Sequence, residues 1–321
     1  MKVRTWCLAL AAGALAAATA QAQNYPNKPV RVVVGTTAGS SMDVVARGLA
    51  ERLSRIWGQS VIVDNRAGAA GLIGEELVAK SAPDGYTLLY AAGSLAARPA
   101  RYRKLPFDVL RDFEPVTQVV SRGEVLTVNP QVPAKDTREL IALAKARPGQ
   151  IRYSTGGVGS ASQMGMELFN LMAGIKLTNV PYKGGPQAIN DVVSGTIEAY
   201  FGGLLPVLPM IKEGRLRALG TSGPRRSSIL PDVQTMAEAG VPGFEFDNWN
   251  GIFVRAGTPP EIVEKIAADI RTVVSSEELK SRFASQGIDL VSTSPADFKK
   301  YFAAEVAKWP EVVKAANIAV Q

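Results

Sequence analysis

The chain has 321 residues and a mass of 34.1 kDa, with 36 Lys plus Arg against 29 Asp plus Glu, one Cys and no His. Because histidine is absent, the chain cannot hold a Ser-His-Asp or Cys-His nucleophilic centre, a His-containing zinc site or a His general base. The positive charges are scattered, and pairs such as Arg225-Arg226 favour solvated surface over a nucleic-acid-binding stripe. A small anionic ligand fits this charge better than a polymer does.

The first 22 residues have the pattern of a secretory signal peptide. Lys2 and Arg4 precede an apolar run over 6–18, and the small-x-small triplet 20–22 follows it. The run is shorter than the roughly 20 residues that span a bilayer, and no later apolar stretch is longer. We therefore expect an exported protein without a membrane anchor. Cleavage after Ala22 removes Cys7, so the mature chain would rely on its core without disulfides.

Strands and helices alternate in the first third of the mature chain. Residues 30–34 form a β-branched run typical of a strand buried on both faces of a parallel sheet. Apolar residues then recur every three or four positions over 45–56, which predicts a helix that ends at Gly58. Further strands are predicted at 61–63 and 86–90, with a helix near 75–80 between them. This rhythm predicts a parallel sheet with right-handed crossovers.

Two extended runs between 116 and 129 follow each other without a helix, which predicts a crossing into a second lobe. A capping box at 136–139 starts a helix in that lobe. Its strands are predicted near 151–154, 176–180, 197–201 and 216–220, and its helices near 162–173, 186–194 and 205–213. An extended segment over 244–254 is the predicted return crossing, and helices follow from Pro259-Pro260 to 317. The predicted boundaries are 1–22 for the signal peptide, 23–124 plus 249–321 for lobe 1, and 125–248 for lobe 2.

Three strand-to-helix loops are rich in glycine and hydroxyl side chains, at 35–43, 154–162 and 182–186. Open α/β sheets bind ligands at the carboxyl ends of their strands. Glycine lets a ligand approach the main chain there, and a helix start offers unpaired N–H groups and the positive end of its dipole. Two such loops, one per lobe, predict a site for one or two carboxylates. Each loop alone is also explained by ordinary helix caps and turns.

Sharper motifs are absent from the sequence. Residues 68–74 lack the dinucleotide-binding glycine spacing, and there is no Walker loop, nucleophile elbow or EF-hand. We therefore predict no cofactor and no metal. The acidic pairs 75–76 and 277–278 are expected at the surface. Trp57 and Trp309 are expected in the core, whereas Trp249 fits either the core or the cleft.

The sequence resembles the Bug or TctC receptors of tripartite tricarboxylate transporters over essentially the whole mature chain. The segments that carry the resemblance are 25–30, 64–66, 82–89, 180–185, 216–219, 230–233 and 256–260. It implies an α/β fold of the two-lobed, type II-like periplasmic binding protein class, in which each lobe is a mostly parallel sheet flanked by helices and two crossover segments join the lobes. It also implies a monomeric, non-enzymatic receptor of the periplasm that delivers a small carboxylate to integral membrane transporter subunits and binds no nucleic acid.

The resemblance places the ligand-facing loops at 36–43 and 154–163, in agreement with the loop chemistry. The candidate ligand-binding residues are Thr36, Thr37, Gly39, Ser40, Ser41, Asp43, Ser94, Ser154, Thr155, Gly159, Ser160, Ser162, Gln163, Tyr182 and Gly202. Asp43 is expected to order its loop, because its charge would repel an anion. The chain departs from the family where Gly35-Thr36 replaces Pro-Phe and Gly202-Gly203 replaces a frequent Asp-Asn pair. Arg98 is expected at the surface.

Two other functions stay open at this point. One is an exported lyase or isomerase that acts on a small carboxylate, with Lys183 or Tyr182 as its base. The other is a ligand sensor that docks on a signalling protein. Turnover of carboxylates would favour the enzyme, and stoichiometric binding of unchanged ligand would favour the receptor.

Overall fold

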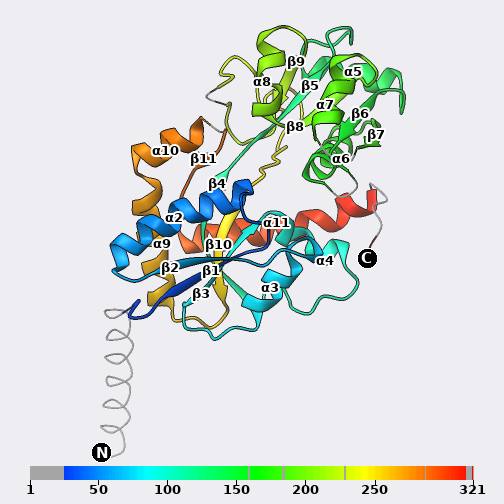
Figure 1. The fold of residues 1–321 in the computed structure, drawn as a ribbon. Helices are drawn as coiled ribbons and strands as arrows, with labels where there is room; N and C mark the ends of the chain where they lie inside the picture. The colour runs from blue at the N-terminus through cyan, green and yellow to red at the C-terminus, as the bar shows by residue number, and fades with distance from the viewer. Residues whose placement is uncertain are drawn as a thin grey trace, which may run out of the picture.

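The computed structural model describes residues 25–157, 160–182, 185–227, 229–285, 287–315 and 320, which form two α/β lobes, one above the other in Figure 1. The predicted signal peptide lies outside these residues. Lobe 1 is built on a six-stranded sheet in the order β11-β4-β10-β3-β1-β2. Its strands are β1 (Val30–Val34), β2 (Val61–Asn65), β3 (Thr87–Ala92), β4 (Phe113–Ser121), β10 (Asn250–Arg255) and β11 (Asp289–Leu290).

Lobe 2 contains a five-stranded sheet in the order β7-β6-β8-β5-β9. Its strands are β5 (Glu124–Val128), β6 (Arg152–Thr155), β7 (Thr178–Pro181), β8 (Ala199–Gly203) and β9 (Arg217–Thr221). In lobe 1, β1 pairs in parallel with β2 and β3, and in lobe 2, β6 pairs in parallel with β7 and β8. Strands β10, β11 and β5 run antiparallel to their neighbours. Most strands of each sheet therefore share one direction, which confirms the predicted fold class.

Helices cover both faces of the sheets. Lobe 1 carries α2 (Ser41–Trp57), the short 3-10 turn η1 (Ala69–Gly71), α3 (Leu72–Ala79), α4 (Ser94–Arg101), α9 (Pro260–Val274), α10 (Glu277–Ala284) and α11 (Pro295–Ala315). Lobe 2 carries α5 (Thr137–Ala146), α6 (Ala161–Ala173), α7 (Gly185–Val193) and α8 (Leu204–Lys212). Sequence patterns missed α4, which is short and contains Pro99, and the two-residue strand β11.

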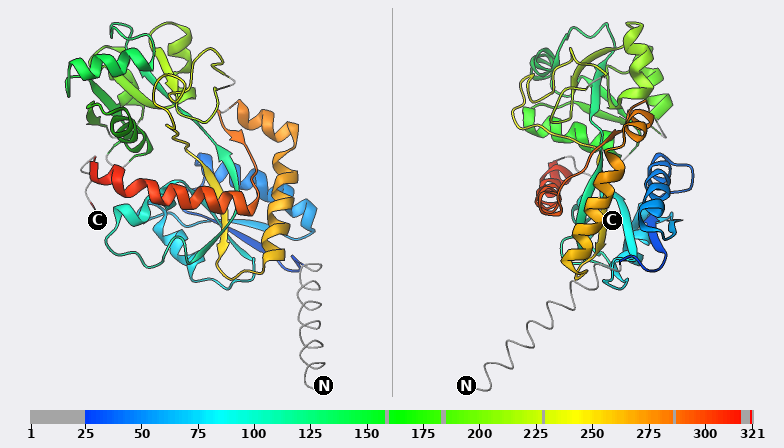
Figure 2. Two further views of the ribbon diagram at one scale, coloured as in Figure 1. Left: turned by 180° about the vertical axis from the view of Figure 1, so that it is seen from behind. Right: turned by 90° about the vertical axis from the view of Figure 1, so that its left-hand side faces the viewer.

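The alternation of side chains along β1 divides the core of lobe 1 into two layers. Val32 and Val34 pack with the apolar faces of α2, α9 and α10, whereas Val33 packs with α3, α4 and α11. The second layer continues into lobe 2 through Phe246 and Trp309, whose ring centroids are 6.1 Å apart. Figure 2 shows α11 running along lobe 1 until it reaches α6. This helix therefore contributes to both lobes.

Two crossover segments connect the lobes side by side. The first runs from β4 to β5 through Arg122 and Gly123, and the second returns to β10. An antiparallel bridge joins Gly123 to Asp247, and the Asn248 N–H donates to the Arg122 carbonyl at 3.0 Å. The predicted strand over 244–254 is regular only from Asn250 onward.

Trp57, Trp249 and Trp309 are buried in the hydrophobic core. Trp249 is fully buried against Phe253, Phe298 and Phe302, and its Nε1 donates to Glu305 at 3.1 Å. It belongs to the core and does not face a cleft. Trp57 and Trp309 are also buried, as predicted.

Candidate functional site

The first predicted loop forms the start of α2. Ser40 is the N-cap, and its Oγ accepts the Asp43 N–H at 3.2 Å and shares a 2.7 Å hydrogen bond with Thr36 Oγ1. The loop therefore ends in a well-defined helix N-terminus, whose remaining N–H groups and dipole favour an anion. The predicted residues Thr37, Gly39 and Ser41 are exposed around this N-terminus.

Asp43 stabilises this loop through hydrogen bonds to its carboxylate. Its buried carboxylate accepts the Gly39 N–H at 2.8 Å, the Arg47 Nε–H at 2.9 Å and the Asn65 Nδ2–H at 2.9 Å. The hydrogen bond from Arg47, followed by those from Gly39 and Asn65, lowers the pKa of Asp43 to about 2. Asn65 also donates to the Thr36 carbonyl at 3.1 Å. With its oxygens occupied in this way, Asp43 shapes the loop and is not free to receive a ligand.

The second predicted loop repeats this arrangement at the start of α6. Ser160 is the N-cap, and its Oγ accepts the Gln163 N–H at 3.3 Å. Ser160 Oγ lies 3.0 Å from Ser162 Oγ, which in turn accepts the Gly156 N–H at 3.1 Å. Gly159 lies outside the described residues. Each lobe therefore presents a serine-capped helix N-terminus.

Other candidates of lobe 2 are engaged inside the lobe. Ser154 and Thr155 are fully buried, and their hydroxyls donate to the Ala188 carbonyl and to Asn179 Oδ1, each at 3.0 Å. Both hydroxyls are thus engaged in hydrogen bonds within lobe 2, and their contact with a ligand stays a prediction. Gln163 is also buried.

Tyr182 and Gly202 border the same end of lobe 2. The Tyr182 hydroxyl donates to the Asp191 carboxylate, and burial together with this bond raises the pKa of Tyr182 to about 12. Such a phenol is poorly suited to act as a base near neutral pH. Gly202 is buried on β8, and an added Cβ would lie 2.2 Å from the Tyr200 hydroxyl.

Ser94 borders two cavities near the proposed site. It is the exposed first residue of α4 and lies on a cavity of about 40 Å³ that Thr36 also borders. It lies as well on a cavity of about 180 Å³ bordered by Ala161 and Met164 from the first turn of α6. Ser94 therefore borders one cavity together with the first loop and another together with the start of α6.

A buried ion pair supports the first loop. Arg98 and Glu75, both expected at the surface, are buried and joined by two hydrogen bonds of 2.9 Å. This prediction was wrong because the two residues lie on different helices that meet only in the folded lobe. Arg98 is consequently not available to a ligand.

Acidic side chains that the sequence analysis did not single out border the larger of these cavities. Asp247 and Glu305 belong to the second crossover segment and to α11. Burial raises the pKa of Asp247 to about 6. The hydrogen bonds that its carboxylate accepts from the Arg122 main-chain N–H and the Gln118 side chain lower this pKa, but by less than burial raises it. No local sequence pattern indicates these positions, since their burial depends on the crossing.

Within the described ranges, no helix has the length and apolar character needed to cross a membrane. The same residues contain no cluster of three or more acidic, cysteine or histidine side chains placed to hold a metal ion.

Comparison with known proteins agrees with the fold. Residues 45–318 match the family described as "Tripartite tricarboxylate transporter family receptor", TctC. Protein BugT of Bordetella pertussis is 37% identical over 300 residues, which are 93% of this chain and 92% of that protein. The solved structure "R. palustris Rpa4515 with adipate" is 33% identical with a TM-score of 0.71, covering 92% of this chain and 99% of the other.

Two further solved structures have the same fold. A TctC solute binding protein from Polaromonas is 26% identical with a TM-score of 0.83, covering 91% of this chain and 99% of the other. MatC from Rhodopseudomonas palustris with bound malate is 29% identical with a TM-score of 0.68, covering 90% of this chain and 100% of the other. The chain therefore belongs to the TctC, or Bug, family of periplasmic solute-binding receptors, which are not enzymes.

Proposed function

We propose that this chain is exported to the periplasm, captures a small dicarboxylate between its two lobes and delivers it to integral membrane transporter subunits. The observation that carries the proposal is the pair of serine-capped helix N-termini, at Ser40 and Ser160. Each offers main-chain N–H groups and a positive dipole end to one carboxylate. The adipate and malate in the two related structures are both dicarboxylates.

Capture involves closure of the lobes. A carboxylate held at one helix N-terminus gains the second set of N–H groups only when the other lobe approaches. The ligand therefore favours the closed state by the free energy of these added contacts. In this proposal Ser94 lies between the two carboxylate positions, because it borders both cavities.

A charge at Ser94 tests the site. Ser94→Glu places a carboxylate in the first turn of α4, where the helix dipole tolerates it, so folding should be preserved. The matched variant Ser94→Gln has the same size without the charge. By calorimetry with adipate and malate, Ser94→Glu should weaken binding about tenfold or more relative to Ser94→Gln, through repulsion of the anion. Equal affinities of the two variants would contradict this location of the site.

Delivery is tested in the cell. Deletion of the gene should abolish uptake of a labelled dicarboxylate that the purified protein binds, and re-expression should restore it. If uptake persists while a transcriptional response to the same acid is lost, the chain serves as a sensor and the delivery role is wrong.

A further inference from the structure

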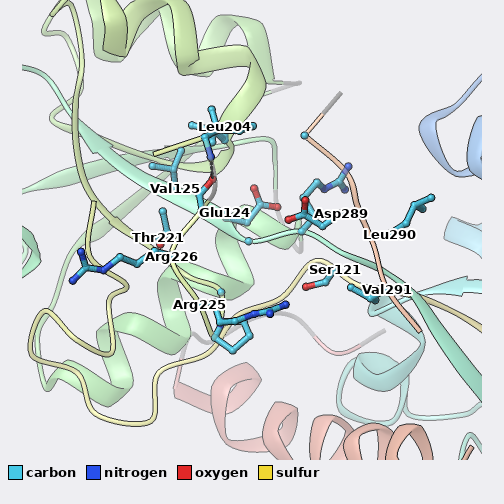
Figure 3. Close-up of a pocket in the computed structure, with 17 residues that line it drawn as sticks. Ser121, Glu124, Val125, Leu204, Thr221, Arg225, Arg226, Asp289, Leu290 and Val291 are labelled. Atoms are coloured by element: carbon cyan, nitrogen blue, oxygen red, sulfur yellow. Dashed lines mark hydrogen bonds between the residues drawn. The ribbon is translucent and has the colours of Figure 1, made fainter. Parts of the chain in front are cut away.

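The crossover region carries a cavity of about 430 Å³ that the function above does not use. It is bounded by the first crossover segment, by the loop that follows β9, and by the chain around β11 (Figure 3). It shares no bordering residue with the two cavities at Ser94. It is therefore a separate space.

The sheet topology places this cavity away from the ligand-facing loops. β11 and β9 are edge strands, each beyond the crossover strand of its own sheet. The first and second loops follow β1 and β6, which lie on the opposite side of β4 and β5 in the strand order. The cavity is thus behind the crossover as seen from the two serine-capped helices.

Buried polar atoms of its walls have no hydrogen-bond partner among the described residues. These atoms are Oε2 of Glu124 and Oγ1 of Thr221, whose residues are each 4% exposed, and Nε of Arg122. Glu124 Oε1 accepts the Asn248 Nδ2–H at 2.8 Å, so only half of this carboxyl is satisfied. Buried polar atoms nearly always have a partner, so these three atoms around a single cavity require hydrogen bonds from a molecule inside it, either water or a ligand.

Opposite charges border the cavity without pairing. Two guanidinium groups, Arg122 and Arg225, and two carboxyl groups, Glu124 and Asp289, belong to its walls. Within the described part of the chain none of the four forms an ion pair, whereas the neighbouring Arg226 pairs with Glu238 at 2.8 Å. Burial raises the pKa of Glu124 and the charge of Arg122 opposes this effect, while Arg225 and Asp289 are exposed. In Figure 3 Glu124 and Asp289 extend into the space from the crossover and from β11.

We infer that this cavity is a second binding site, for a small zwitterion that carries one ammonium and one carboxylate group. The carboxylate would pair with Arg122 and Arg225, and the ammonium with Glu124 and Asp289. Such a ligand neutralises both kinds of charge, whereas an ion of one sign leaves two like charges of the wall unpaired. Thr221 supplies a neutral hydrogen bond.

Occupancy of this site is linked to lobe movement. Its walls come from lobe 2, from the crossover and from β11 of lobe 1, so any change in the angle between the lobes changes the cavity. A zwitterion that fits one angle better shifts the population toward it, and by reciprocity changes the affinity for the carboxylate between the lobes.

Calorimetry on the full mature chain tests this inference with L-alanine and glycylglycine as zwitterionic probes. Acetate and ethylamine are the singly charged controls. We expect at least one zwitterion to bind, and Arg122→Gln and Asp289→Asn each to weaken it about tenfold or more. Arg215→Gln, an exposed arginine outside the cavity, should leave the affinity unchanged. Asp289 is exposed, so its variant should fold even if Arg122→Gln does not.

Assays with one ligand at a time distinguish this cavity from the dicarboxylate site. Ser94→Glu should leave zwitterion binding intact, and the two cavity variants should retain dicarboxylate binding in zwitterion-free buffer. The inference is overturned if neither zwitterion binds, if acetate or ethylamine binds as tightly, or if Ser94→Glu instead of Asp289→Asn abolishes zwitterion binding.

Discussion

Arg98 holds both carboxylate oxygens of Glu75 inside lobe 1, through Nε and Nη2 at 2.9 Å each. Arg98 Nη2 also donates to the Ala70 carbonyl. Ala69 and Ala70 adopt positive φ values of 46° and 54°, which are strained for alanine. The ion pair thus holds the turn that precedes α3. Gly35 at the start of the first loop packs on this turn, where an added Cβ would lie 2.9 Å from the Gly71 Cα.

Loss of one partner of this pair should destabilise the protein strongly. Arg98→Met leaves the Glu75 carboxylate buried without a cation, and we expect a loss of about 3–5 kcal/mol in the free energy of unfolding. The double variant Glu75→Leu, Arg98→Met removes both charges and should recover most of the lost free energy of unfolding. Urea unfolding of the three proteins measures both effects. A double variant less stable than Arg98→Met would show that the turn depends on the charges themselves.

Asp43 should contribute stability that is lost in acid. Its pKa is lowered to about 2 in the fold, so its stabilising effect is present above the unfolded pKa of about 4 and is lost as the pH falls towards 2. Asp43→Asn should lower the free energy of unfolding by about 1–2 kcal/mol at neutral pH, and by less near pH 2. Asp84, whose side chain is 41% exposed and pairs with Lys28 at 3.4 Å, provides the control. Asp84→Asn should have little effect, because the amide oxygen can still accept the Tyr86 N–H that Oδ1 accepts at 3.0 Å. A loss for Asp43→Asn that stays constant with pH would contradict the prediction.

Asp247 should have the opposite pH dependence. Burial raises its pKa to about 6, so the folded state binds its proton more tightly than the unfolded state does. Stability from this group is therefore fully present below about pH 4 and is lost as the pH rises through about 6. Relative to Asp247→Asn, the wild-type free energy of unfolding should fall by on the order of 2–3 kcal/mol between pH 4 and 7. Parallel urea titrations at several pH values measure this difference. Identical pH profiles of the two proteins would exclude the effect.

Gly165 should be essential for the position of α6. A Cβ at this residue would lie 2.3 Å from Phe201 Cε1 and 3.0 Å from Phe246 Cδ1, both in the buried core. Gly165→Ala should cost about 1–3 kcal/mol and, by displacing the N-terminus of α6, weaken carboxylate binding. At Gly203 an added Cβ would be no closer than 3.8 Å to its neighbours, so Gly203→Ala is the matched control. Thermal unfolding and calorimetry of both variants test this, and equal stability of the two would refute it.

The sequence by itself determined the local elements and the two serine-capped helix starts. β-Branched runs, apolar periodicity and caps such as Ser40 and Ser160 act within a few residues along the chain, so their patterns predict strands, helices and N-termini directly. The two-lobed, type II-like architecture followed from the family resemblance, and the parallel pairing from the alternation of strands and helices. The order of the strands came only from the structure.

Only the tertiary structure decided which side chains the site can use. Ser154 and Thr155 turned inward, Arg98 found Glu75 on another helix, and Trp249 joined the aromatic core of α11. The crossover cavity likewise combines Glu124 with Asp289, which are far apart in the chain. Burial and pairing of charges depend on contacts between distant segments, and a local pattern carries no information about which distant segment will lie opposite.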